Sequence, residues 1–546
     1  MAPHREPWTT SFVAFDIIVK HGGAEMQRPM IARQMGKTLL GGLFGRFLAS
    51  RRGGVTIPFA LAAVPLAVLS VAAVDYHRAT MIKTGLQDAL DAATLTVGRS
   101  TATTASAVQS LGDSAIKANL QSYPNTLLTT DTFVLNGNTV QSTAQVTATP
   151  LMAGVFGSKI TVTAQSQVVR AVNALEVAMV LDNTGSMAGT KISLLKTAAS
   201  NFIDTLSAAA ATSTNPNAVK IGIVPFSMTV NVGSQYKSAS WIDTTGASPI
   251  NDQIFSTHAN RLTLFQQMGV SWGGCVENRQ APYDVQDTAP TTSTPATLFT
   301  PYFAPDEPGN SGTTWNGMTW YNNYLADGTT STSWSTRQGN VAKYNTKTFV
   351  NSGTNNSTGY TYGPNAGCSL QPLTRLSTNW TTLKTAINAM TVGGDTNIPM
   401  GMVWGWHVLS PNAPFADGVA YGTPKTTKVI VMMTDGQNQN TPNSNSDASF
   451  YSGDGYIWQN RLGITSGSQT QRQTALDARE TLVCNNMKAQ GIVIYTVRID
   501  VQDSNYAVLQ ACASSPSQFY DVQDVTQLNS VFAAIAGAIE NLRIAQ

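Results

Sequence analysis

Two continuous apolar runs lie far apart in this chain of 546 residues and limit its fold more than any other feature. Val177 to Leu181 and Val429 to Met433 contain no charged side chain. Runs of this kind are typical of parallel strands that are buried on both faces. Segments with helical periodicity alternate with these runs. The sequence therefore predicts an α/β fold, with a doubly wound, mostly parallel sheet flanked by helices.

The expected elements of this domain begin near residue 173. Strands are expected at 175–181, 219–226, 429–433 and 492–497, and helices at about 191–210, 380–390, 399–409, 471–489 and 525–542. One face of the first helix shows the period clearly, with Ile192, Leu195, Ala199, Phe202 and Leu206 at helical spacing.

Oxygen-bearing side chains follow the two apolar runs. Asp182 comes directly after the first run, and Asp435 follows the second. Ligands of open α/β sheets collect at the carboxyl ends of strands. The predicted metal ligands are Asp182, Thr184, Ser186, Thr396 and Asp435. Because all five offer carboxylate or hydroxyl oxygens, we expect Mg²⁺, with Mn²⁺ or Ca²⁺ as possible substitutes, rather than zinc or copper.

These segments resemble the metal-ion-dependent adhesion site of von Willebrand factor type A domains. The D-x-S-x-S loop of that family matches Asp182, Thr184 and Ser186, where threonine for serine keeps the hydroxyl. Its second-loop threonine matches Thr396 and its third-loop aspartate matches Asp435, which is expected to act through water. A helix N-cap at Asp182 is the simpler alternative, but it would explain only the first loop.

The resemblance implies protein recognition through the metal. Two carboxylates nearly neutralise a divalent cation but leave it under-coordinated, so it can still accept an acidic side chain from a partner. A magnesium-dependent phosphohydrolase is the alternative from a different class, although the sequence offers no obvious general base. The segment Gly185 to Lys191 does not have the order of a phosphate loop, and neither H-E-x-x-H nor G-x-S-x-G occurs. We therefore expect that the protein is not an enzyme.

An apolar segment near the N-terminus predicts a membrane anchor. Val55 to Val74 has no charged residue and about the 20 residues that cross a bilayer. Arg46, Arg51 and Arg52 precede it, so the N-terminus is expected in the cytoplasm and the bulk of the chain outside. A signal peptide cleaved near Ser70-Val71-Ala72 is the alternative, but the long leader before the segment favours an anchor.

This region resembles the N-terminal module of TadE/TadG-like proteins of bacterial tight-adherence (Flp) pilus systems. The resemblance is carried by Arg51 to Gly54, Phe59 to Leu61, Asp75-Tyr76 and Leu86 to Ala93. Five residues after Gly53 stands Pro58, where TadE-like pseudopilins carry glutamate, so an uncleaved, TadG-like protein is expected.

The C-terminal segments Ile494 to Val497, Cys512 to Ser515 and Phe519 to Asp521 also resemble TadG-like chains. Together these resemblances imply a single-pass protein of the bacterial inner membrane with a periplasmic region. They also imply a role in pilus assembly or anchoring, with another pilus component as partner. The partner and the oligomeric state are not set by the sequence.

Charge and cysteine content narrow the function classes further. Only 12% of residues are charged, the formal net charge is +2, and no basic stripe with interleaved aromatics occurs, so nucleic acid is not an expected partner. The four cysteines follow the apolar segment and form no C-x-x-C motif. We expect the disulfides Cys275–Cys368 and Cys484–Cys512 in an oxidising compartment, with four buried thiols as the alternative.

Two polar insertions interrupt the predicted metal-binding domain. Residues 233–372 contain five of the ten tryptophans, Trp241, Trp272, Trp315, Trp320 and Trp334. A segment so rich in tryptophan is expected to fold, and these side chains form either its own core or a partner-binding face. Residues 437–468 follow Asp435 and are expected to overhang the metal.

The predicted organisation has four parts. They are a cytoplasmic segment 1–52, a transmembrane helix 53–75, a TadE/TadG-like helix with a small antiparallel sheet at 76–172, and a von Willebrand A domain at 173–546. The small sheet is predicted from alternating residues on either side of Asn136-Gly137-Asn138.

Overall fold

A computed structural model describes residues 56–544 of the chain. The described range has gaps at 101, 103, 122–126, 138, 152–158, 170–172, 212, 214, 309–312, 316–317, 321, 328–329, 355–360 and 502–505. The predicted cytoplasmic segment 1–52, its arginines and Gly53 lie outside the described residues. The described residues divide into two compact units, and the boundary crosses helix α2 after Ala79.

Helix α2 covers Thr56–Arg99 and contains Pro65. Its first part is apolar and exposed, with Phe59, Leu61 and Leu66 each more than half accessible. Among the described residues it is the one helix that is long and apolar enough to cross a membrane. Such exposed apolar side chains are costly in water and suit a lipid environment.

The later part of α2 belongs to a small α+β module. Its elements are α3 (Ala105–Leu120) and the antiparallel sheet β1 (Leu127–Asn136), β2 (Thr139–Ala148) and β3 (Ile160–Val169), in the order β1-β2-β3. Alternate residues of β2, such as Val140 and Ala144, are buried against Leu90 of α2. Asn136 pairs with Thr139 across a turn in which Gly137 has a φ of +61°. An antiparallel sheet was expected in this part of the chain.

The C-terminal domain contains a six-stranded sheet with the order β10-β5-β4-β11-β12-β13. The strands are β4 (Ala174–Asp182), β5 (Val219–Phe226), β10 (Thr374–Ser377), β11 (Thr426–Thr434), β12 (Val493–Ile499) and β13 (Phe519–Val522). All neighbouring pairs are parallel except β10 with β5 at the edge. The predicted mostly parallel α/β fold is therefore confirmed.

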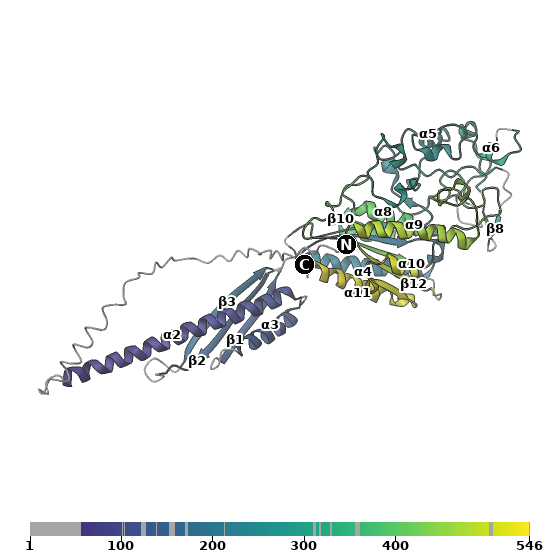
Figure 1. Cartoon of the computed structure of the whole chain (residues 1–546). Coiled ribbons are helices and arrows are strands. Elements are labelled where there is room, and N and C mark those ends of the chain that lie inside the picture. Colours follow the sequence, from purple (N-terminus) through teal and green to yellow (C-terminus); the bar gives the residue numbers. More distant parts are fainter. Residues whose placement is uncertain are drawn as a thin grey trace, which may run out of the picture. The chain divides into compact units, whose positions relative to one another are not determined.

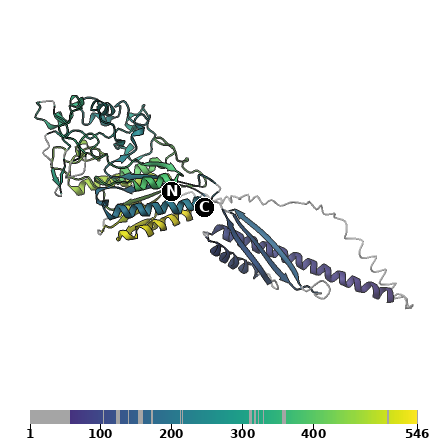
Figure 2. The ribbon, with the colours of Figure 1, turned by 180° about the vertical axis from the view of Figure 1, so that it is seen from behind.

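Helices cover both faces of this sheet, as Figures 1 and 2 show. They are α4 (Thr190–Ala211), α7 (Trp380–Asn388), α8 (Ile398–Leu409), α9 (Gln469–Ala489), α10 (Ala507–Cys512) and α11 (Leu528–Ile544). Side chains of α4, α7 and α11 share a core with Val177 and Met179 of β4. Those of α8, α9 and α10 share the opposite core with Ala178 and Val180. The apolar run is uninterrupted because alternate residues serve different cores.

The first insertion folds into loops with short elements. They are β6 (Val230–Asn231), α5 (Arg261–Gln267), β7 (Cys275–Val276), β8 (Thr313–Trp315), β9 (Met318–Trp320) and α6 (Trp334–Gln338). Trp241 and Trp272 are buried, in a core that the insertion shares with β4 and α8 rather than one of its own. The side chains of Trp315 and Trp320 lie outside the described residues.

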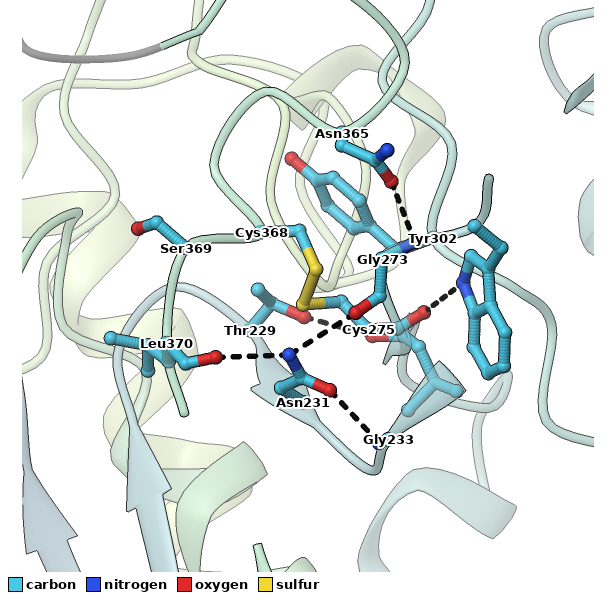
Figure 3. The surroundings of a disulfide bond; sticks show 12 residues. Thr229, Asn231, Gly233, Gly273, Cys275, Tyr302, Asn365, Cys368, Ser369 and Leu370 are labelled. Carbon is cyan, nitrogen blue, oxygen red and sulfur yellow. Dashed lines mark hydrogen bonds between the residues drawn. A yellow bond between two sulfur atoms is a disulfide. The ribbon is translucent and has the colours of Figure 1, made fainter. Parts of the chain in front are cut away.

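A disulfide closes the base of this insertion (Figure 3). Cys275 is bonded to Cys368, and beside it Asn231 donates from Nδ2 to the carbonyls of Leu370 (2.9 Å) and Gly273 (3.2 Å). The second disulfide joins Cys484 of α9 to Cys512 of α10. Both predicted pairings are confirmed. Cys275 and Cys368 are 93 residues apart, so their bond removes much conformational entropy from the unfolded chain.

The two insertions are joined to each other by buried polar contacts. The Asn278 amide N–H donates to the Gly453 carbonyl at 2.8 Å, and Gln338 Nε2 donates to Asp447 at 3.1 Å. Glu277 is fully buried and accepts from Arg461 at 2.6 Å. Segments that are separate in sequence therefore form one folded layer, in which the buried charge of Glu277 is paired.

Candidate metal centre

The strand order brings the two predicted aspartates to one place. β4 and β11 are adjacent and parallel, with Leu181 opposite Met433. The chain leaves β4 toward β5 on one side, whereas β11 lies on the other side, so their carboxyl ends flank a topological switch point. Ligands of doubly wound sheets bind at such points.

Asp182 is fully buried at the end of β4 and accepts two hydrogen bonds. Its Oδ1 accepts from the Thr184 amide at 2.8 Å, and its Oδ2 accepts from the Thr434 hydroxyl at 2.7 Å. Burial and then the charge of Asp435 raise the pKa of Asp182 to about 6, against the lowering effect of these hydrogen bonds. The carboxylate of Asp182 thus lies in a place that disfavours its charge.

Asp435, which follows β11, is hydrogen-bonded to the loop that follows β4. Its Oδ1 accepts from the Ser186 hydroxyl at 2.7 Å, and the Ser186 and Thr184 hydroxyl oxygens are 2.9 Å apart. Thr184 is buried whereas Ser186 is exposed. Four of the five predicted ligands, Asp182, Thr184, Ser186 and Asp435, therefore form one hydrogen-bonded network.

Thr396 lies in a loop that is bonded to the first segment through the backbone. The Gly185 amide donates to the Gly394 carbonyl at 3.1 Å, and Asn183 Nδ2 donates to the Thr391 carbonyl at 2.7 Å. Thr396 itself is 3% exposed, and its carbonyl accepts from the Gln439 amide at 2.8 Å. The structure thus places this loop beside the network, although among the described residues the side chain of Thr396 makes no hydrogen bond to it.

The neighbouring Asp395 has a different role. Its carboxylate accepts from the amide (2.7 Å) and the hydroxyl (3.1 Å) of Thr441 in the second insertion. Burial raises the pKa of Asp395 to about 6, although both bonds from Thr441 act in the opposite direction. Asp395 therefore anchors the second insertion. That this insertion overhangs the metal stays a prediction.

Lys191 contacts the candidate site and was missed by the sequence interpretation. Its ammonium group lies 2.8 Å from Asp435 Oδ2 and 3.3 Å from Asp500 Oδ2. Burial lowers the pKa of Lys191, but the hydrogen bonds and charges of Asp435 and Asp500 outweigh this and raise it. Only its position in the first turn of the helix, nine residues after Asp182, could have indicated it. Thr434 was equally overlooked as a partner of Asp182.

The donor set fits a hard divalent cation. The network contains two carboxylates and two hydroxyls and no nitrogen or sulfur ligand atom. The charge of one carboxylate is compensated by Lys191, while the buried Asp182 has a Thr434 hydroxyl and a backbone amide as its donors. A small, positively charged ion would stabilise the ionised form of Asp182 in this position.

The fold and this network define a class: an α/β domain with a candidate cation site, on a chain with an apolar helix that could cross a membrane. Residues 53–100 match the family model described as "Putative Flp pilus-assembly TadE/G-like". The chain therefore carries a TadE/G-like pilus-assembly segment, and this confirms the resemblance inferred from the sequence. No curated protein matches the chain at a significant level.

Several solved structures are similar to the chain at low identity. The von Willebrand factor domain of the type V pilus tip protein Mfa5 from Porphyromonas gingivalis is 10% identical. That match covers 69% of this chain and 97% of the other, with a TM-score of 0.32. The PilB minor pilin from Streptococcus sanguinis is 11% identical, covering 77% and 79%, with a TM-score of 0.30.

Proximal thread matrix protein 1 from the mussel byssus, in a structure with a zinc-occupied MIDAS motif, is 10% identical. The match covers 68% of this chain and 47% of the mussel protein, with a TM-score of 0.27. Likeness at this level supports no conclusion about what this chain binds.

Proposed function

We propose that this protein is a membrane-anchored, non-enzymatic component of a tight-adherence (Flp) pilus system that binds a protein partner through a divalent cation. Asp182, Thr184, Ser186, Thr396 and Asp435 would hold Mg²⁺, or Mn²⁺ or Ca²⁺ in its place. The partner would be another pilus component that offers an acidic side chain. The TadE/G-like match at residues 53–100 supports the pilus assignment.

One observation carries the metal assignment. Side chains up to 253 residues apart in sequence, Asp182, Ser186 and Asp435, meet in a single network at the switch point of a parallel sheet. A helix N-cap would explain only the hydrogen bonds around Asp182. It would not explain why the hydroxyl of Ser186 donates to the carboxylate of Asp435. Convergence of oxygen donors at this position is what cation binding requires.

The cation would supply a positive charge with an open coordination position. The residues of this chain do the rest: Asp182 is held by Thr184 and Thr434, and Ser186 is held by Asp435. Because Ser186 is exposed while Asp182 is buried, the site opens to solvent on the side of the serine. A carboxylate from a partner would approach from this side.

We further propose a location in the bacterial inner membrane. Helix α2 would cross the bilayer once, with the N-terminus in the cytoplasm and residues after the span in the periplasm, as the arginines before the span favour. The two disulfides are consistent with an oxidising compartment. Residues 76–172 and 173–546 would then form the exported parts.

A pull-down from bacterial membranes tests the proposal. Full-length protein should capture a pilus component in Mg²⁺ and release it when a chelator is added. Asp182→Ala should abolish capture, because the cation loses its buried carboxylate. The matched control is Asp204→Ala, which removes an aspartate that is more than half exposed and pairs with Lys384 at the surface of α4.

Two results would contradict the proposal. Capture that persists in chelator and in the Asp182→Ala variant would remove the metal from recognition. Release of phosphate from phosphate esters by the wild-type protein, lost in the same variant, would instead favour a magnesium-dependent hydrolase. Loss of capture in Asp204→Ala as well would show that the assay reports folding rather than the site.

A further inference from the structure

A second pair of carboxylates lies on α9, outside the network described above. Asp477 and Glu480 are three residues apart in a helix and therefore share one face. Asn438 connects them, because its Nδ2 donates to Asp477 Oδ1 at 2.9 Å and to Glu480 Oε2 at 2.6 Å. Neither carboxylate is a member of the predicted site.

This pair has no counter-charge among the described residues. Glu480 is 1% exposed, and its Oε1 has no hydrogen-bond partner there. Arg479 is adjacent in sequence but pairs with Asp284 instead. Burial and then Asp477 raise the pKa of Glu480 to about 8, and burial also raises the pKa of Asp477. A buried carboxylate without a cation or a full set of donors is costly.

A small cavity lies against both carboxylates. Its volume of about 20 Å³ is enough for one water molecule or one small ion. Besides Asp477 and Glu480, its polar lining consists of Gln437, Asn438 and Gln473, and no lysine, arginine or histidine is present. Carboxylate and amide oxygens around a space of this size are the ligand types of a hard cation.

We propose that Asp477 and Glu480 hold a divalent cation at this cavity, with amide oxygens of Gln437 or Gln473 as additional ligands. The cation would supply the counter-charge that the buried Glu480 lacks. It would be distinct from a cation at Asp182 and Asp435, because the two ligand sets share no residue.

A cation in this place would also hold the loop between the two sites. The Asn438 carbonyl oxygen Oδ1 accepts from the Ile398 amide at 2.9 Å, at the start of α8. The next residue, Gln439, donates its amide to the Thr396 carbonyl. The carboxylates that orient Asn438 thus position the segments that carry Asp435 and Thr396. This consequence rests on the proposed function, whereas the second site itself does not.

Counting bound Mn²⁺ on the purified full-length protein tests the inference. Free Mn²⁺ would be measured by electron paramagnetic resonance during a titration of the wild type, of Asp182→Ala and of the double variant Asp477→Asn/Glu480→Gln. We expect two bound ions for the wild type and one for each variant. The two substituted side chains keep the size and shape of the originals, so the circular dichroism spectrum of the double variant should match that of the wild type.

Two outcomes would overturn the inference, and a third would separate it from the proposed function. One is a double variant that binds as many ions as the wild type, which would mean that the cavity holds water only. Another is a wild type that binds a single ion lost in Asp182→Ala. If the wild type instead binds one ion that is lost only in the double variant, the second site stands and the proposed function fails. Asp204→Asn is the control for weak binding to exposed carboxylates.

Discussion

Replacing Asp182 by asparagine should stabilise the cation-free protein at neutral pH. The pKa of Asp182 is raised from 3.8 to about 6, mainly by burial and then by Asp435. The folded state therefore binds this proton more tightly than the unfolded state does. The contribution of Asp182 to the free energy of unfolding is fully present below pH 3.8 and is lost as the pH rises through about 6. At about 1.4 kcal/mol per pH unit, the loss amounts to about 3 kcal/mol.

The surroundings of Asp182 can accept an amide without losing hydrogen bonds. Oδ1 of the asparagine would still accept from the Thr184 amide, as Asp182 Oδ1 does now. Its Nδ2 would donate to the Thr434 hydroxyl, which can turn its own hydrogen toward the Gly436 carbonyl at 3.2 Å. The variant thus removes a buried charge and keeps its partners, so most of the roughly 3 kcal/mol should be recovered.

The measurement is urea unfolding of the full-length protein, followed by tryptophan fluorescence at pH 4 and pH 7.5, with chelator or with Mg²⁺. In chelator, Asp182→Asn should equal the wild type at pH 4 and exceed it by up to about 3 kcal/mol at pH 7.5. Mg²⁺ should stabilise the wild type at pH 7.5 and have little effect on the variant, because stabilisation follows ligand binding to the folded state.

Two results would refute this reasoning. If the variant is less stable than the wild type in chelator at pH 7.5, the buried charge of Asp182 is not a cost. If Mg²⁺ stabilises both proteins equally, Asp182 is not a ligand. Asp204→Asn serves as the matched control, because this aspartate is more than half exposed and should change neither comparison by more than about 1 kcal/mol.

Two further substitutions test other parts of the structure. Lys191→Met removes the ammonium group that lies 2.8 Å from Asp435. Because this charge competes with a cation, the substitution should tighten Mn²⁺ binding on the order of tenfold, as measured by calorimetry. An unchanged affinity would show that the lysine does not compete with the cation. Gly112→Ala would place a Cβ 2.3 Å from the ring of Phe133 and should destabilise the N-terminal module by about 1–3 kcal/mol. In thermal unfolding, the exposed Ser114→Ala on the same helix should have little effect, and equal results for the two would contradict the packing argument.

Much of the fold was predictable because its signals are local. The runs Val177 to Leu181 and Val429 to Met433 are apolar at every position, so each had to be buried on both faces, and they form the adjacent central strands β4 and β11. Helical periodicity located α4, which extends from Thr190 to Ala211, to within one residue at each end. The turn at Gly137 was visible for the same reason, since a left-handed residue between alternating strands has a strong preference for glycine.

The members of the candidate site were also visible in the sequence, but their contacts were not. The motif and the strand ends pointed to Asp182, Ser186 and Asp435, whereas the strand order β5-β4-β11 decided that they would meet. Lys191 was missed because a lysine in the first turn of a helix is usually solvated. Whether it reaches Asp435 depends on distances across more than 240 residues of chain.

The sequence by itself determined which segments are strands and helices, which segment is apolar enough for a membrane, and which residue types are available at the strand ends. Only the tertiary structure decided how the charges are balanced: Lys191 compensates Asp435, Thr434 and Thr184 hold Asp182, and Glu480 has no counter-charge among the residues that the structure describes. The physical reason is that hydrophobic periodicity acts over a few residues, whereas the energy of a buried charge depends on every group packed around it.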